Sequence, residues 1–394
     1  MISALMPTYD RYSLQIKSGS GCYLFDAQGR RYLDFGSGIA VNSLGHCHPK
    51  LVSAITEQAS RIWHCSNLYD IPAQQKLANR LVSNTFADTV FFNNSGAEAI
   101  ETGIKIIRKF HYESGNPEKY RIITIDGAFH GRTLATISAS RQKKYITGFG
   151  PLVEGFDQVP FNNLKILKET IGPHTGGVLI EPIQGEGGIR PFSDDYLVAL
   201  RTICDENGLL LMFDEVQSGV GRTGKFYAYE WTKMTPDIMA SAKGLGGGFP
   251  VGACLATEQA GLALTAGSHG TTFGGNPMAM AVSNAVLDII FEKDFLENVR
   301  FQSSLFIKHL KNIINKNASL VTEIRGRGLM LGLCCTSKVN NSELVKTLMS
   351  KGLLTVPAAD NVVRLIPPLI VSTSEITEAA SIIEDSLKHI ANKT

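Results

Sequence analysis

The sequence predicts an α/β protein with a large domain on a mostly parallel sheet and a smaller α+β domain. Three observations predict it. The chain has 394 residues, more than one hydrophobic core usually serves. Apolar residues at helical spacing alternate with short apolar runs bounded by Gly, Pro or Asp. Polar clusters follow several of these runs, as they do in sheets whose functional groups lie at the carboxyl ends of the strands.

The N-terminal segment, residues 1–50, contains a predicted hairpin. Gly21 to Phe35 alternates in character around a turn at Gln28-Gly29, which is typical of two antiparallel strands. We expect this segment to pack with the small domain.

Residues 51–277 are predicted to form the large domain. Leu51, Ile55 and Ala59 recur at helical spacing, and further helices separate short apolar runs. Alternating strands and helices favour a parallel sheet covered on both faces. The runs expected to be strands are 90–92, 121–125, 178–180, 209–213, 237–240 and 251–256.

Residues 278–394 are predicted to form the small domain. A helical stretch runs from Met278 to about Asn315, and Ile376, Ala380 and Ile383 mark one face of a last helix. Between them lie strand-like segments at 329–334, 353–356 and 362–366.

Composition favours a small-molecule partner in the cytoplasm. The formal net charge is only +2 and no run of like charge is present, which argues against a nucleic-acid or membrane-surface partner. The seven cysteines are scattered and form no C-x-x-C pair, so we expect reduced thiols. His46-Cys47-His48 lacks a second ligand pair, and we assign no metal.

Two strand ends carry the strongest chemical signal. Asp214 ends one buried run, and Lys243 ends another before a glycine-rich turn. Pyridoxal phosphate (PLP) needs both residue types: a carboxylate that keeps its ring nitrogen protonated and a lysine that stores it as an imine. A helix cap for Asp214 and a solvated side chain for Lys243 are the alternatives. The combination favours PLP as the cofactor and Lys243 as the catalytic residue.

A phosphate cradle is predicted where the run ending at residue 92 passes into a helix. We expect Ser95, Gly96 and Ala97 to bind the cofactor phosphate, because free N–H groups at a helix start face anions. A simple N-cap by Ser95 with Glu98 is compatible with this. The other glycine-rich stretches lack the P-loop and dinucleotide patterns, which argues against a nicotinamide-dependent oxidoreductase. A non-catalytic binding protein would not need Lys243.

These segments resemble the class III subgroup of fold-type I aminotransferases, which contains acetylornithine, ornithine and 4-aminobutyrate aminotransferases. The resemblance covers nearly the whole chain. The matching motifs are AVNSLGHCHP (40–49), NNSGAEA (93–99), AFHGRT (128–133), EPIQGEGG (181–188), FDEVQ (213–217), GTTFGGNP (270–277) and NVVRLIPP (361–368).

The resemblance implies roles at the cofactor. Phe129 stacks on one face of the ring, Val216 covers the other, and Gln217 hydrogen-bonds the ring hydroxyl. Thr272 reaches the cofactor phosphate of the neighbouring subunit, which implies a homodimer with shared sites. Glu181 is expected close to the cofactor.

The resemblance also implies how substrates bind. Arg132 and Arg364 correspond to arginines that bind substrate carboxylates, and Thr271 is expected at the substrate as well. Glu186 corresponds to a gate that pairs with Arg364 for the amino donor and swings away for glutamate or 2-oxoglutarate.

The expected reaction is ping-pong transamination of N2-acetyl-L-ornithine with 2-oxoglutarate, a step of arginine biosynthesis. Ornithine aminotransferases carry a tyrosine in the loop that corresponds to residues 36–41, where it helps to hold the free α-amino group. This chain has none there, so the acetylated amine fits better. Ornithine, succinylornithine and N-succinyl-diaminopimelate remain alternative donors.

Overall fold

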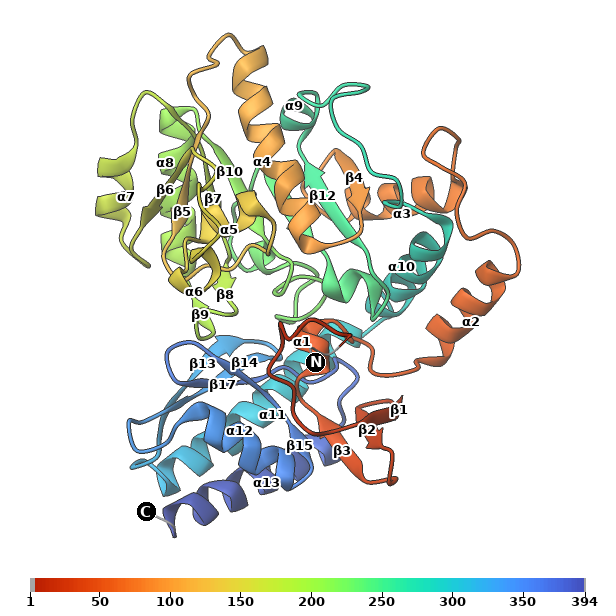
Figure 1. The fold of residues 1–394 in the computed structure, drawn as a ribbon, viewed down its shortest axis with the longest axis vertical. Coiled ribbons are helices and arrows are strands. Elements are labelled where there is room, and N and C mark those ends of the chain that lie inside the picture. Colours follow the sequence, from red (N-terminus) through yellow and green to blue (C-terminus); the bar gives the residue numbers. More distant parts are fainter. Residues whose placement is uncertain (1–3, 393–394) are drawn as a thin grey trace.

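A computed structural model describes residues 4–392, and its centre is a seven-stranded sheet (Figure 1). The strand order is β4-β12-β11-β10-β7-β5-β6, and β12 alone runs antiparallel to its neighbours. The bounds are β4 Thr89–Asn93, β5 Arg121–Ile125, β6 Phe156–Val159, β7 Thr175–Ile180, β10 Leu210–Asp214, β11 Ile238–Ser241 and β12 Gly252–Ala256. The mostly parallel α/β fold predicted from the sequence is therefore correct, and so are its six predicted strands.

Helices cover both faces of this sheet, and its central strands are therefore buried throughout. Every residue of β7 and of β10 is buried, as in parallel sheets covered on both faces. Helix α4 (Gly96–Glu113) packs on β11 and β12, with α5 (Leu134–Ser140) beside it. Helix α8 (Asp194–Asn207) packs on β10, and α7 (Leu164–Thr170) packs on β6.

The expected single helical stretch after residue 278 is two helices. Helix α10 (Pro277–Ile290) ends before residue 291, and α11 (Phe295–Lys316) begins after Asp294, whose φ of 68° breaks the helical path. Helix α10 packs on α2 (Pro49–Ala59) and α3 (Pro72–Ser83).

The C-terminal third forms an antiparallel sheet in the order β13-β14-β17-β16. Its strands are β13 Val321–Arg327, β14 Met330–Cys335, β16 Val356–Ala358 and β17 Val362–Leu365, flanked by α12 Asn341–Ser350 and α13 Thr373–Ala391. The sequence did not predict β13 because charged residues interrupt it.

The N-terminal strands join this smaller part of the molecule. The predicted hairpin is present as β2 (Tyr23–Asp26) and β3 (Arg31–Asp34), with β1 (Ile16–Ser20) beside it. Strand β15 (Leu353–Leu354) pairs in parallel with β3. On these contacts we propose a small domain formed by both ends of the chain. The packing of α10 leads us to propose its boundary after residue 290 rather than at 277.

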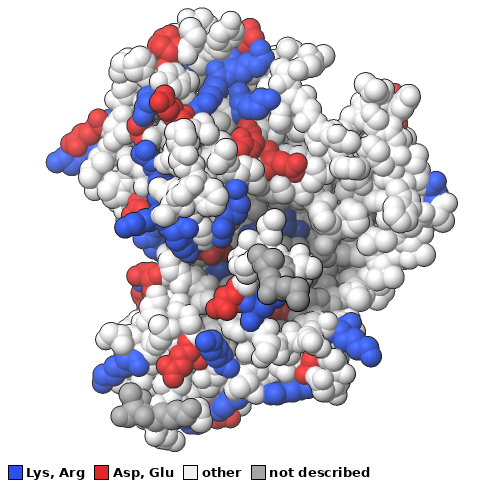
Figure 2. All heavy atoms as spheres, in the orientation of Figure 1, with Lys and Arg blue, Asp and Glu red and all other residues white. Residues whose placement is uncertain are grey.

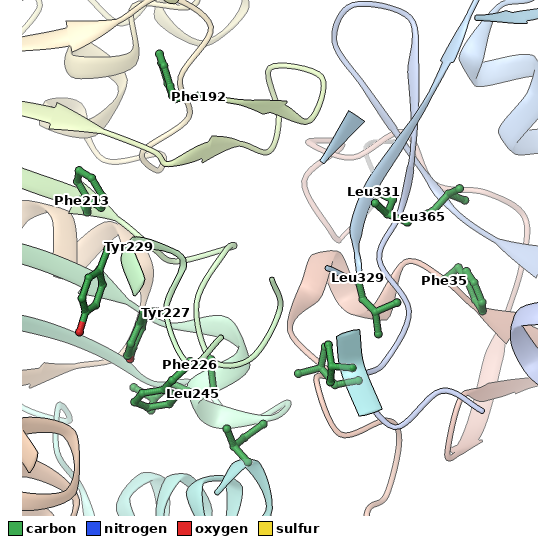
Figure 3. Packing of buried hydrophobic residues seen from close by; sticks show 14 of the residues in the cluster. Phe35, Phe192, Phe213, Phe226, Tyr227, Tyr229, Leu245, Leu329, Leu331 and Leu365 are labelled. Atoms are coloured by element: carbon green, nitrogen blue, oxygen red, sulfur yellow. The ribbon is translucent and has the colours of Figure 1, made fainter. Parts of the chain in front are cut away.

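One hydrophobic cluster joins the two parts. Figure 3 shows Phe213 and Leu245 on the side of the large sheet, and Phe35, Leu331 and Leu365 on the other. All five are fully or almost fully buried. The short elements near this junction or on the surface are α1 Ser37–Ala40, α6 Lys143–Ile146, β8 Ile183–Gln184, β9 Arg190–Pro191, η1 Ala228–Trp231, η2 Lys243–Gly246 and α9 Glu258–Gly261. None of the helices within residues 4–392 has the length and apolar character needed to cross a membrane.

Candidate active site

A cavity of about 430 Å³ lies at the carboxyl ends of the large sheet. This volume is within the range of small-molecule sites. Its walls include ten residues that the sequence predicted for the site: Ser95, Gly96, Ala97, Phe129, Arg132, Glu181, Asp214, Val216, Gln217 and Lys243. They come from segments far apart in the sequence, because strands β4, β5, β10 and β11 all end at this edge.

Lys243 enters the cavity from a strained backbone position. It follows β11 and begins the short helix η2 with φ of 44°, a left-handed conformation that side chains rarely adopt. Strain of this kind is found mainly where function fixes the geometry. Burial lowers the pKa of the Lys243 amine, and the positive charge of Arg364 lowers it further. A lowered pKa favours the neutral amine, which is the form that attacks a carbonyl.

Asp214 ends β10 and belongs to a buried polar network. Its Oδ2 is 2.8 Å from His130 Nδ1, and its Oδ1 accepts a hydrogen bond from the N–H of Val216 at 3.0 Å. Burial, followed by the charge of Asp214, raises the pKa of Glu181 to about 7. Glu181 accepts hydrogen bonds from the N–H groups of Phe129 and Gly185. His130 therefore belongs to the site, although in the sequence it was included only as part of the AFHGRT motif (128–133).

The start of α4 is arranged as an anion cradle. Within residues 4–392, the N–H groups of Ser95, Gly96 and Ala97 have no acceptor. The Ser95 hydroxyl caps the N–H of Glu98 at 3.2 Å. Glu98 does not close the usual capping box on Ser95, because its Oε2 accepts the N–H of Asn94 at 2.7 Å instead. Three neighbouring donors at a helix start are suited to a phosphate.

These observations fit PLP. Besides the free N–H groups, the buried Nε2 of His130 has no partner among the described atoms, although His130 lines the cavity. A Cβ at position 96 would come within 2.7 Å of Val216 Cγ1, so glycine there permits the anion cradle to lie close to Val216.

Arg364 is a buried arginine with one acidic partner in the described part of the chain. It lies in β17, its side chain is 1% exposed, and its Nη1 is 2.5 Å from Glu186 Oε1. Its other hydrogen bonds are longer, at 3.4 Å to Gln217 Oε1 and 3.3 Å to the carbonyl of Pro357. The structure thus brings together the arginine and the glutamate that the sequence paired.

Arg132 differs from Arg364 in its surroundings. It is exposed at the cavity wall and makes no ion pair with any described residue. Its Cζ lies 3.8 Å from the ring centroid of Tyr145, a residue that the sequence analysis did not select.

Thr271 and Thr272 do not line this cavity. They line a second one of about 470 Å³, together with Phe91, Glu98 and His269. Thr271 accepts a hydrogen bond from Asn94 Nδ2 at 3.3 Å, while Thr272 is exposed. Thr271, predicted at the substrate, therefore does not reach this cavity within one chain, and neither does Thr272, which was predicted to reach the cofactor of the neighbouring subunit.

His46, from the segment His46-Cys47-His48, has an acidic partner: its Nε2 is 2.8 Å from Asp34 Oδ2. Among the described residues no group of three or more His, Cys, Asp or Glu side chains is placed to hold a metal ion.

The fold, the lysine, the aspartate and the anion cradle together define the class of PLP-dependent transferases. The family model described as "Aminotransferase class-III" matches residues 5–387, and the chain belongs to this family. It is therefore an aminotransferase, and PLP is its cofactor.

Relatives and solved structures agree with this assignment. The chain is 55% identical over 390 residues to an acetylornithine aminotransferase of Brucella melitensis, covering 99% of this chain and 96% of the relative. The structure of N-acetylornithine aminotransferase from Stenotrophomonas maltophilia K279a matches with a TM-score of 0.86 at 34% identity, covering 98% of each chain. An ornithine aminotransferase structure from Toxoplasma gondii, described with partial occupancy of PLP at its active site, matches with a TM-score of 0.94 at 30% identity, covering 98% of this chain and 93% of that chain.

Proposed function

We propose that this enzyme transfers the δ-amino group of N2-acetyl-L-ornithine to 2-oxoglutarate, giving N-acetyl-L-glutamate 5-semialdehyde and L-glutamate for arginine biosynthesis. The observation that carries the proposal is the contrast between the two arginines. Arg132 has no acidic partner among the residues that the structure describes, whereas Arg364 is neutralised by Glu186.

This contrast answers the needs of the two half-reactions. The donor has one carboxylate, remote from the reacting amine, and Arg132 is free to bind it. The acceptor 2-oxoglutarate has a second carboxylate beside the reacting carbon, and it needs Arg364 with Glu186 moved aside. Glu186 is 19% exposed, so its side chain borders space into which it can turn.

The chain's own groups supply the acid and base. PLP, when bound, acts as the electron sink for the bond broken at the substrate carbon. Lys243 Nζ holds PLP at rest and moves the proton from the substrate carbon once it is released. The Asp214 carboxylate, held by His130, keeps a proton on the ring nitrogen. Phe129 and Val216 exclude water from the two faces of the ring, and Gln217 binds the ring hydroxyl.

The cavity favours an acylated donor. Among its described lining residues only Glu181 and Asp214 are acidic. Asp214 contacts His130, and Glu181 accepts hydrogen bonds from the N–H groups of Phe129 and Gly185. Val41 lines the cavity and belongs to the loop 36–41, which corresponds to the loop where ornithine aminotransferases carry a tyrosine. The free α-ammonium of ornithine would therefore meet no carboxylate without a partner of its own among the described lining residues, and an unpaired charge in a closing pocket is costly.

We also propose a cytoplasmic homodimer with shared active sites. Thr272 is exposed and lies outside the chain's own cavity, and Trp63, Leu68 and Phe273 expose large apolar side chains. A second copy of the chain would cover them and receive Thr272 at its cofactor phosphate. The seven cysteines are free, as expected of a reducing compartment.

The test is a panel of amino donors assayed with 2-oxoglutarate: N-acetylornithine, ornithine, succinylornithine and N-succinyl-diaminopimelate. We expect the highest kcat/KM for N-acetylornithine. A higher value for ornithine would overturn the argument from the missing countercharge, and a higher value for a succinylated donor would reassign the acyl group.

A further inference from the structure

The two arginines of the site are held by different chemistry. A carboxylate holds Arg364, whereas the face of an aromatic ring holds Arg132. Arg132 Cζ lies 3.8 Å from the centroid of Tyr145 and 5.7 Å from that of Phe129. Within residues 4–392 the guanidinium of Arg132 has no hydrogen-bond acceptor. A guanidinium stacked in this way keeps its N–H donors free along its edge.

We propose that Tyr145 is a positioning residue, which holds Arg132 ready for the substrate carboxylate that lies away from the reacting carbon. The inference rests on the proposed function, in which Arg132 binds that carboxylate in both half-reactions. Tyr145 does not line the cavity, so it acts through Arg132 and not by touching substrate. Stacking before substrate arrives reduces the rotamer freedom that Arg132 loses on binding.

A ring suits this position better than an acid. A carboxylate beside Arg132 would neutralise it and would have to move away before substrate bound, as the proposed function requires of Glu186 at Arg364. The face of Tyr145 attracts the cation through its quadrupole and leaves the full positive charge for the substrate.

The surroundings of Tyr145 remain positively charged. Lys144 Nζ lies 4.6 Å from the same ring centroid, and both residues belong to α6. Figure 2 shows Lys and Arg side chains gathered around α6, on the side of the large sheet that faces the smaller part of the molecule. Dicarboxylates approaching the cavity therefore meet a basic rim, of which Arg132 is the member that lines the cavity.

Tyr145 also contacts Phe129, the residue proposed to cover one face of the cofactor ring. Its centroid is 5.6 Å from that of Phe129, with an angle of 72° between the rings. A substitution at position 145 could therefore disturb the cofactor through Phe129. The test must separate this route from the route through Arg132.

The experiment compares Tyr145→Phe and Tyr145→Leu in the PLP-loaded enzyme. Calorimetry gives the Kd of glutarate, an unreactive dicarboxylate, and steady-state kinetics give KM for 2-oxoglutarate. We expect Tyr145→Leu to raise both roughly two- to fivefold. We expect kcat and the visible absorption spectrum to stay the same. The Tyr145 hydroxyl has no partner in the described structure, so Tyr145→Phe should behave like the parent enzyme. Tyr112→Leu, at an exposed tyrosine of α4, is the matched control.

Two further variants make the result decisive. In an Arg132→Ala background, Tyr145→Leu should not weaken the binding of glutarate any further. Tyr145→Gln, which removes the ring but keeps a polar end, repeats the test should the leucine variant fold poorly. Unchanged affinity in both ring-deleted variants would overturn the proposal, and so would a full effect that persists without Arg132. Because glutarate binding does not depend on the amino donor, failure to use N-acetylornithine would overturn the proposed function alone.

Discussion

Replacing Glu186 by glutamine should change which substrates the enzyme prefers. Arg364 is buried, and Glu186, which it contacts at short distance, is its one charged partner among the described residues. Glutamine keeps the shape but removes the countercharge. Glutamate as donor would no longer have to displace an anion, whereas N-acetylornithine would bind beside an uncompensated arginine.

The size of the effect follows from that one contact. A hydrogen bond to a charged group contributes about 1.5–3 kcal/mol. The bonds from Arg364 to Gln217 and Pro357 remain, and they are long. The ratio of kcat/KM for glutamate to that for N-acetylornithine should therefore rise roughly ten- to a hundredfold.

Single-turnover kinetics measure each half-reaction separately by the change in cofactor absorption. Glu186→Asp, which keeps the charge, is the control and should shift the ratio much less. Equal losses in both half-reactions would refute the reasoning, because they would show that Glu186 does not distinguish the substrates.

Three further predictions concern other groups. Asp214→Asn should lower kcat about a hundred- to a thousandfold, since the ring nitrogen loses its anionic partner. Steady-state kinetics measure this decrease, and a much smaller one would contradict the role of Asp214. Thr272→Ala should weaken PLP binding about tenfold through one lost hydrogen bond to phosphate, and a titration of apoenzyme with an unchanged Kd would contradict the shared site. Burial raises the pKa of Glu215 to about 7, above its usual value of 4.5. Between these two pH values the folded protein keeps a proton on Glu215 that the unfolded chain has released. The contribution of neutral Glu215 to the free energy of unfolding is therefore fully present below about pH 4.5 and is lost as pH rises through 7. The loss is about 3 kcal/mol at 1.36 kcal/mol per unit. From pH 5 to 8 the melting temperature of the parent enzyme should fall more than that of Glu215→Gln. Equal dependence of the two melting temperatures on pH would count against a buried, neutral Glu215.

The sequence predicted those parts of the fold where burial leaves a strong pattern. Strand β10, which ends at Asp214, is apolar until its last residue, so both the strand and its functional end could be recognised. Strands β6 and β13 mix polar and apolar residues, and they were missed for that reason. The break between α10 and α11 depends on Asp294, whose left-handed backbone no periodicity reveals.

The candidate site shows the same division. Lys243 and the cradle at Ser95 lie within local motifs, so their spacing alone pointed to them. The contact of His130 with Asp214 joins residues 84 positions apart, and that of Tyr145 with Arg132 joins helix α6 to the loop before α5. Such pairs are fixed by tertiary packing, and no pattern in a single sequence marks them.

The most direct test of the account is reductive trapping of the purified, PLP-loaded enzyme. After borohydride treatment, digestion and mass analysis should place one pyridoxyl group on Lys243, and Lys243→Ala should bind PLP without forming the adduct and without transaminating. An adduct on another lysine, or near-parental turnover by Lys243→Ala, would contradict the account.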